Sequence, residues 1–396
     1  MMISLEGIAT LAIASFILLI GHFLKHQIGF LHRYNLPSPV IGGLLAALSL
    51  LICQQVGWQI KFDTTIKTPL MLAFFTSLGF AASLRLLKIG GKYVLIFLAI
   101  SIFAAILQNA VGASAAWAMG LPPLLGVLCG SVTLTGGPAT GLAFAPQFEA
   151  VGIVGAESIA VAAAMCGIIM GGVMGGPIGT VLIRRLQAKH QPLVANSPQT
   201  IFKLDNINTA HDQDLLKSVG LLLVAMWLGS FISQFFTSVN ITLPAYIGAM
   251  LAAAILRNVN DIYQWSTINY EQVEYLGGVA LSYFLVLSLM GLDLSKLSAV
   301  ALPLLVLIGL QVLLMATLSM TLIFKFMGKD YEAAVTATGF YGFMMGTTAN
   351  AMANMDAFVK RYSPSPRAYL VVPIVGAFFI DFANTLLIQL CLNLFS

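Results

Sequence analysis

Charged residues are scarce in this chain. Of its 396 residues only 9% are charged while 59% are hydrophobic, and the mean hydropathy is +0.93. A soluble fold of this length cannot bury that much apolar surface, whereas a bilayer accommodates it. The composition therefore excludes a soluble protein and predicts an all-α polytopic membrane protein.

Cysteine is equally sparse, with four residues at positions 53, 129, 166 and 391, all in apolar or small-residue surroundings. Their wide spacing predicts packing roles and excludes a disulfide or metal framework. The chain also lacks a zinc-binding His-Glu-x-x-His, a serine elbow and a phosphate-binding loop, which argues against a membrane enzyme or an ATP-driven pump. We expect no organic cofactor. The first apolar run, Gly7–Phe23, lacks a basic start and a cleavage site, so we interpret it as a retained span.

What the chain does have is an internal repeat. Gly136–Gly141 aligns with Met345–Asn350 at an offset of 209 residues, and the alignment continues without gaps to Gly167 and Gly376. Both stretches are too rich in glycine and hydroxyl groups for an ordinary spanning helix. Duplicated apolar halves with interrupted segments at matching places are typical of secondary transporters, in which substrate and ion bind between the halves.

Each half contains five apolar runs. They cover roughly 7–23, 40–56, 69–84, 93–118 and 159–183, then 216–236, 243–256, 276–292, 299–326 and 369–394. We predict two inverted repeats, residues 1–185 and 216–396, joined by a cytoplasmic linker at 186–215. Between the fourth and fifth span of each repeat we predict a re-entrant hairpin, about 124–148 and 333–355, because broken backbone at membrane depth must avoid lipid. A pair of surface loops is the alternative.

The basic residues test this topology. With ten spans and two returning hairpins, 16 of the 19 Lys and Arg fall on one side and 3 on the other. The positive-inside rule makes the richer side cytoplasmic and puts both termini outside. The net charge of +4 is then a topology signal, and we expect no nucleic-acid partner.

Asp381 lies about 12 residues into the last span, roughly 18 Å along a helix and near the bilayer centre. A carboxylate there marks an ion path by default, and Asn384 follows on the same face. With Asn354 these residues are the candidate sodium ligands; a protonated Asp381 that bonds a neighbouring helix is the alternative. The repeat places Gly172 opposite Asp381, so such an ion site would be asymmetric. Glycines at 167, 171, 175 and 179 form a stripe for close helix packing.

The hairpin tips are the candidate substrate site. Broken segments can aim free amides at an anionic group and free carbonyls at a cation. The candidate substrate-binding residues are Gly136, Gly137, Thr140, Gly346, Thr347, Thr348, Asn350 and Arg367. Arg367 could hold a carboxylate with its bidentate fork, or act as an interfacial anchor. Gln108 and Asn109, in the middle of a span, fit interhelical hydrogen bonding as well as function.

The second hairpin and its sequel resemble a known family. The stretch Gly346-Thr347-Thr348, then Ser365-Pro366-Arg367-Ala368, and above all Val371–Asn384 is similar to the bacterial sodium:glutamate symporter family. Gly136-Gly137 with Thr140 resembles that family's other glycine-rich motif. The chain departs from the family where it has Pro138 and Ala139 in the first hairpin and Ala349 and Asn350 in the second.

The resemblance covers nearly the whole chain. It implies a sodium-coupled importer of glutamate, or of a similar small carboxylate, in the bacterial inner membrane, with the two hairpins meeting at the transport site. A passive channel and an ion-coupled carrier of another organic anion are the alternatives. We expect the substrate, sodium and lipid as partners and leave a homodimer open.

Overall fold

The computed structural model describes residues 2–188, 212–238, 244–265, 267–292, 297 and 300–395. Most of the predicted linker, 189–211, lies outside the described residues. The elements of the first part of the chain are β1 (Met2–Leu5), α1 (Gly7–Gln27), α2 (Gly29–Arg33), α3 (Ser38–Gln55), β2 (Gln59–Phe62), α4 (Lys67–Ala81), α5 (Leu84–Ala118), α6 (Pro123–Val127), η1 (Leu128–Val132), α7 (Gly137–Ala150) and α8 (Ala156–Ala188). Those of the second part are α9 (Asp212–Ser238), α10 (Ala245–Tyr263), α11 (Tyr270–Met290), α12 (Ala301–Leu318), η3 (Ser319–Ile323), α13 (Phe324–Phe326), α14 (Tyr331–Met344), α15 (Thr348–Val359), α16 (Pro366–Ile374), η4 (Val375–Phe379) and α17 (Ile380–Phe395).

The chain is helical, as its composition predicts. Within the described residues seven helices are long and apolar enough to cross a bilayer. They coincide with seven of the ten predicted spans. The other three predictions fall on α4, which has 15 residues, on the less apolar α10, and on α16–α17, whose path is interrupted by the π-helical turn η4.

One feature was not predicted: β1 and β2 form a parallel pair with Met2 opposite Gln59 and Leu5 opposite Phe62. Each strand has only four residues. That length is too short for the period-two alternation by which strands are recognised in a sequence. The pair joins the start of α1 to the segment that follows α3.

The helices form two compact units, each drawn from both halves of the sequence. The first unit comprises Met1–Phe23, Ser38–Ile89 and Phe202–Gly291, and the second comprises Leu24–Pro37, Gly90–Ile201 and Leu292–Ser396. The compact units therefore differ from the repeats at 1–185 and 216–396. Both hairpins, with Asp381 and Asn384, belong to the second unit.

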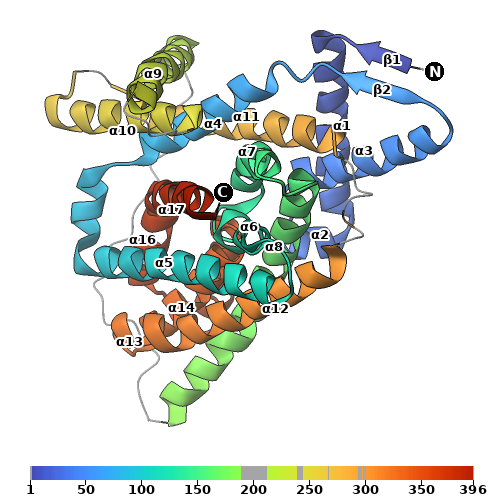
Figure 1. Ribbon diagram of the computed structural model, residues 1–396. Coiled ribbons are helices and arrows are strands. Elements are labelled where there is room, and N and C mark those ends of the chain that lie inside the picture. Colours follow the sequence, from blue (N-terminus) through green and yellow to red (C-terminus); the bar gives the residue numbers. More distant parts are fainter. Residues whose placement is uncertain are drawn as a thin grey trace. The chain divides into compact units, whose positions relative to one another are not determined.

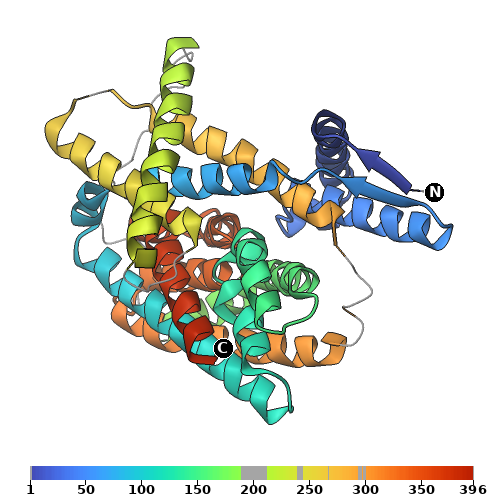
Figure 2. The same cartoon turned by 45° about the horizontal axis from the view of Figure 1, so that its top comes forward.

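In the first unit α4 packs against α10 and α11, and Figures 1 and 2 both show α4 running alongside α11. Small residues permit this close approach: a methyl group added at Gly79 would meet the Met250 carbonyl, and one at Gly277 would overlap Ser77. Arg257 fastens the end of α4, because its guanidinium donates to the Phe80 carbonyl at 3.3 Å while its side chain pairs with Asp261.

In the second unit α8 carries the predicted glycine stripe, and the stripe contacts the second hairpin. A methyl group at Gly167 would lie 2.6 Å from the Met345 carbonyl oxygen, and one at Gly171 would lie 3.2 Å from the Asn350 amide nitrogen. Further along, Gly175 and Gly179 leave room for Asn354 and Phe358. The packing role predicted for the stripe is confirmed.

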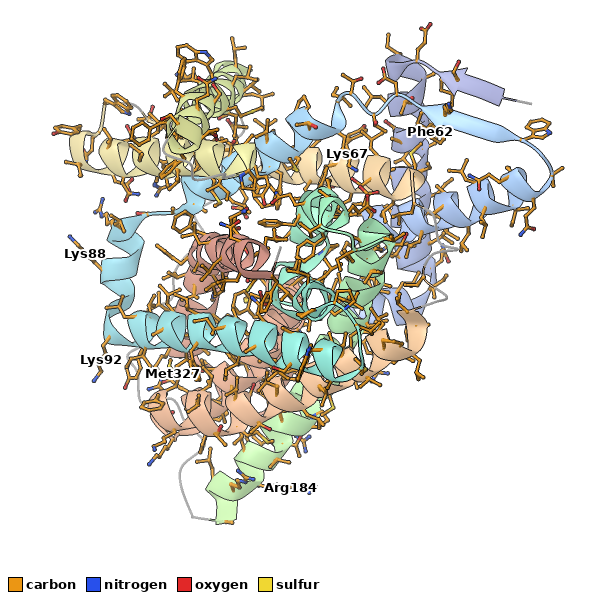
Figure 3. The ribbon with its side chains drawn as sticks, viewed as in Figure 1. Phe62, Lys67, Lys88, Lys92, Arg184 and Met327 are labelled. Atoms are coloured by element: carbon orange, nitrogen blue, oxygen red, sulfur yellow. The ribbon has the colours of Figure 1, made fainter. Side chains whose placement is uncertain are left out.

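In the predicted topology Lys92 and Arg184, two basic residues of the second unit, fall on the cytoplasmic side. Both are exposed, and Figure 3 shows their side chains pointing away from the helices that carry them. Such positions suit a headgroup region, where lysine and arginine keep their charge in water.

Candidate functional site

The first hairpin starts at α6 and returns along α7. Pro123 occupies the first turn of α6, where its missing N–H costs nothing. The helix then changes to the π-helical η1 and breaks at Gly130, with φ −101° and ψ −127°. A turn with Gly137 at φ +68° begins α7. That backbone conformation is strained for any residue with a side chain, so glycine is needed there.

The second hairpin has stronger helix-start signals. Asp330 caps α14 by accepting a hydrogen bond from the Ala333 amide at 2.8 Å, and Thr347 caps α15 by accepting one from the Asn350 amide at 3.3 Å. Every residue of α14 is buried. A glycine-containing helix that is buried all round has no lipid-facing side, as expected for an interrupted segment that avoids lipid.

The two tips meet inside the second unit. A methyl group added at Gly137 would lie 3.5 Å from the Gly346 carbonyl oxygen, and Thr135 Oγ1 lies 4.0 Å from Met344 Sδ. In each pair the two residues are 209 positions apart, which is the offset of the repeat.

Gln108, in the middle of α5, joins both tips. Its Nε2 donates to the Met344 carbonyl at 3.0 Å, and its Oε1 accepts from Thr135 Oγ1 at 2.6 Å. Gln311 of α12 in turn donates to the Gln108 carbonyl at 2.7 Å. Gln108 is 0% exposed, so each of these bonds is made away from water. The helix α5 therefore holds the two hairpin tips together.

We expect Gln108→Leu to destabilise the tips and reduce transport. The change leaves the Met344 carbonyl and the Thr135 hydroxyl buried without their partner, at a cost of about 2–4 kcal/mol. The midpoint of thermal unfolding in detergent and initial uptake rates measure the two effects. Gln54→Leu, at an exposed position near the end of α3, is the matched control. Equal unfolding midpoints and equal uptake rates of the two variants would contradict the proposed role of Gln108 in joining the tips.

The predicted tip residues lie at the starts of α7 and α15, where the two hairpin tips meet. Gly136 and Gly137 begin α7, with Thr140 one turn along, while Gly346, Thr347, Thr348 and Asn350 lie at the start of α15. Two helix N-termini therefore start at adjacent tips. The first-turn amides of a helix have no intrahelical partner and carry partial positive charge, which suits a carboxylate. Asn350 Nδ2 donates to the Ile168 carbonyl at 2.7 Å, and its buried Oδ1 has no partner among the described residues.

The predicted ion ligands Asn384 and Asn354 bond different elements. Asp381 and Asn384 lie on α17, and the Asn384 amide nitrogen donates to the Ser131 carbonyl of the first hairpin at 2.9 Å. Asn354 instead donates to the Gly171 carbonyl at 2.9 Å and belongs to the contact between α15 and α8. The observed contacts of Asn354 and Asn384 share no residue.

Arg367 is engaged by carboxylates of its own chain. Its guanidinium pairs with Asp330 and lies 3.8 Å from Glu332, and its backbone amide donates to Glu332 Oε1 at 3.0 Å. The guanidinium also lies over the Tyr93 ring at 4.8 Å. Arg367 thus ties α16 to the start of the second hairpin and to α5. A substrate carboxylate would compete with both acids for it.

Two residues at the junction had no assigned role in the sequence: Gln108, whose function was left open, and Ser131. The signal for Gln108 was a polar side chain in the middle of an apolar span. Ser131 gave no signal, because a serine among small residues is ordinary in helix packing.

Comparisons with known proteins show the family to which the chain is similar. The profile of the family described as "Sodium/glutamate symporter" matches residues 3–364. The chain is 39% identical over 396 residues to the sodium/glutamate symporter of Escherichia coli (strain K12), with 99% of each chain covered. It has the same identity and coverage with the Shigella flexneri sodium/glutamate symporter. With that of Haemophilus influenzae (strain ATCC 51907 / DSM 11121 / KW20 / Rd) it is 36% identical over 393 residues, covering 96% and 95%.

The family profile ends before Asp381, but the full-length relatives align through the last helix. This family and these relatives are transporters and not enzymes. Within the described residues seven helices are long and apolar enough to span a membrane. The chain belongs to the sodium/glutamate symporter family.

Proposed function

We propose that the protein is a sodium-coupled symporter that imports glutamate or a similar small carboxylate across the bacterial inner membrane. Membership of the family supports the reaction, and the meeting of two helix N-termini at the hairpin tips supports an anionic substrate. Sodium is the coupling ion in this proposal, and transport needs no organic cofactor. Glutamate offers two carboxylates, which could face one N-terminus each.

The substrate residues we propose are those of the tips: Gly136, Gly137, Thr140, Gly346, Thr347, Thr348 and Asn350. The unpaired Oδ1 of Asn350 could accept from the substrate ammonium group, since an amide oxygen is a good acceptor for N–H donors. Arg367 would join this site only after release from Asp330 and Glu332. Because the Glu332 side chain is 1% exposed, that release would cost a buried carboxylate its guanidinium partner, and we rank Arg367 last among these residues.

We further propose that the halves are inverted repeats with re-entrant hairpins and that both termini face outside. The contacts between equivalent residues at the tips and the basic bias of 16 to 3 support this topology. Most of the predicted linker lies outside the described residues, so exposed Lys92 on α5 serves as the cytoplasmic marker.

The topology can be tested with single cysteines in a cysteine-free background. We expect an impermeant maleimide to label Lys61→Cys in intact spheroplasts and to label Lys92→Cys only after permeabilisation. Both positions are exposed, so accessibility within the protein is matched. Labelling of the two cysteines from the same side would refute the inverted arrangement.

The function itself is tested by uptake into proteoliposomes. We expect saturable accumulation of radiolabelled glutamate against its gradient when sodium is high outside, and none when choline replaces sodium. Aspartate, succinate and 2-oxoglutarate as competitors would define the accepted carboxylates. Equilibration without accumulation would favour a channel, and accumulation of another organic anion would favour the alternative carrier.

A further inference from the structure

Ser131 and Asn384 carry two buried oxygen atoms that nothing in the described structure satisfies. Both residues are 0% exposed. Neither Ser131 Oγ nor Asn384 Oδ1 has a hydrogen-bond partner among the described residues. Burying such a group without a partner is costly, so buried polar atoms are usually paired or bind a ligand.

The two oxygens belong to one small cluster. Asn384 Nδ2 donates to the Ser131 carbonyl, which also accepts from the Gly136 amide at 2.9 Å. Because a carbonyl oxygen can only accept, the amide nitrogen of Asn384 must face it. The amide oxygen is therefore the free atom. The Ser131 amide is held in turn by Asn109 Oδ1 at 3.1 Å.

The broken helix explains why the Ser131 hydroxyl is free. Buried serines in helices usually donate to the carbonyl four residues back. Ser101 does so to Phe97 and Ser319 does so to Met315, both at 2.8 Å. Gly130 interrupts the helical backbone directly before Ser131, and no such bond forms there.

Asp381 supplies the charge. It lies one turn before Asn384 on α17, and α17 contacts η1, which carries Ser131. Its carbonyl accepts from Thr385, but its carboxylate has no hydrogen bond or ion pair among the described residues. In a membrane an unpaired carboxylate is retained for an ion or a proton.

We propose that Ser131 Oγ and Asn384 Oδ1, with the Asp381 carboxylate, form a site for one monovalent cation, and that this cation is the coupling sodium. This inference rests on the proposed function and adds a ligand from the first hairpin. Hydroxyl, amide and carboxylate oxygens are the hard donors that such cations prefer. The single carboxylate balances a single positive charge. Within the described residues no group of three or more His, Cys, Asp or Glu could hold a transition metal.

The site would couple the bound ion to the tip of the first hairpin, where we propose that the substrate binds. Ser131 lies five residues before Gly136 in the same hairpin, and the Gly136 amide bonds its carbonyl. A cation that fixes Ser131 would therefore order the tip that begins α7. Asn354, which contacts α8 instead, takes no part in this site.

Sodium binding to the purified wild type and to Ser131→Ala tests the proposal. The readout is the rise in thermal unfolding midpoint with sodium, at ionic strength kept constant with choline. We expect the dissociation constant for sodium, fitted to the logarithmic dependence of this midpoint on sodium concentration, to rise about tenfold in Ser131→Ala, the loss of one ligand bond. Ser101→Ala is the matched control, since it removes an equally buried hydroxyl that has a backbone partner, and it should keep the wild-type value.

If Ser131→Ala does not fold, Ser131→Cys replaces it, because sulfur nearly preserves the volume but is a poor ligand for sodium. A Ser131 variant with the wild-type dissociation constant for sodium would overturn this site, while sodium-driven uptake by the wild type would still uphold the proposed function. A wild type that shows neither sodium-dependent stabilisation nor sodium-dependent uptake would overturn both.

Discussion

Replacing Gly137 with valine is expected to abolish uptake while leaving membrane insertion intact. Gly137 has φ +68°, and a methyl group there would lie 3.5 Å from the Gly346 carbonyl oxygen. The larger side chain would force the tips apart, and a displacement of about 1 Å at a binding site costs about 100-fold in rate. Initial rates of sodium-driven uptake, normalised to protein in the membrane, measure the loss.

Gly152 provides the matched control for strain. It has φ +95°, but a side chain there would meet nothing within 4 Å. Gly152→Val thus carries a similar backbone penalty away from the tips and should retain most uptake. Normal abundance is expected for both variants, because insertion depends on the flanking apolar helices. Equal loss in both would assign the effect to backbone strain and remove the argument for the tips.

The other tip should be equally sensitive. A methyl group at Gly346 would lie 3.0 Å from the Ile168 Cα and 2.8 Å from the side-chain Nδ2 of Asn350, so Gly346→Val should also abolish uptake. Gly309→Val in α12, where a side chain has open space, is its control. Sensitivity of one tip alone would place the site in one half and contradict a shared one.

The second large effect is expected from Asp381→Asn. This change keeps the shape of the side chain but removes the negative charge that balances the bound cation. We expect the sodium concentration for half-maximal uptake to rise about 10- to 100-fold, as befits the loss of a charged ligand. Uptake measured over a series of sodium concentrations, with choline as replacement, gives this value, and immunoblotting gives the abundance.

Asp63→Asn is the control for loss of a carboxylate charge. Asp63 lies in the connection before α4, where hydrogen bonds from the Thr65 hydroxyl and amide hold the pKa of its carboxyl below the ordinary value. It is therefore ionised at neutral pH, and its neutralisation should leave sodium dependence unchanged. If Asp381→Asn keeps the wild-type sodium concentration for half-maximal uptake, Asp381 has a structural role and is not an ion ligand.

The sequence by itself determined the class of the protein, because hydropathy is a sum over residues and needs no tertiary information. Long apolar runs predicted helices such as α1, α8 and α12, and all three are present. The repeat predicted the two hairpins, because two matching glycine-rich stretches in equivalent places indicate two copies of one structural element. The stripe from Gly167 to Gly179 predicted close packing, because spacing of four places residues on one helix face.

Only the tertiary structure decided how polar residues pair. Gln108 reaches Met344 across 236 positions and Asn384 reaches Ser131 across 253, and no local period encodes such distances. The same holds for Arg367, whose acidic partners lie 37 and 35 positions away. The side chains at these positions were visible in the sequence, but their roles were not.

The compact units were also a tertiary result. Hydropathy orders helices along the chain but does not say which of them pack together, because most apolar faces in a membrane protein are chemically alike. Close contacts between small residues and buried hydrogen bonds make that choice. They brought Gly137 to Gly346 and Ser131 to Asn384, so the residues found by pattern became a site only once the chain was folded.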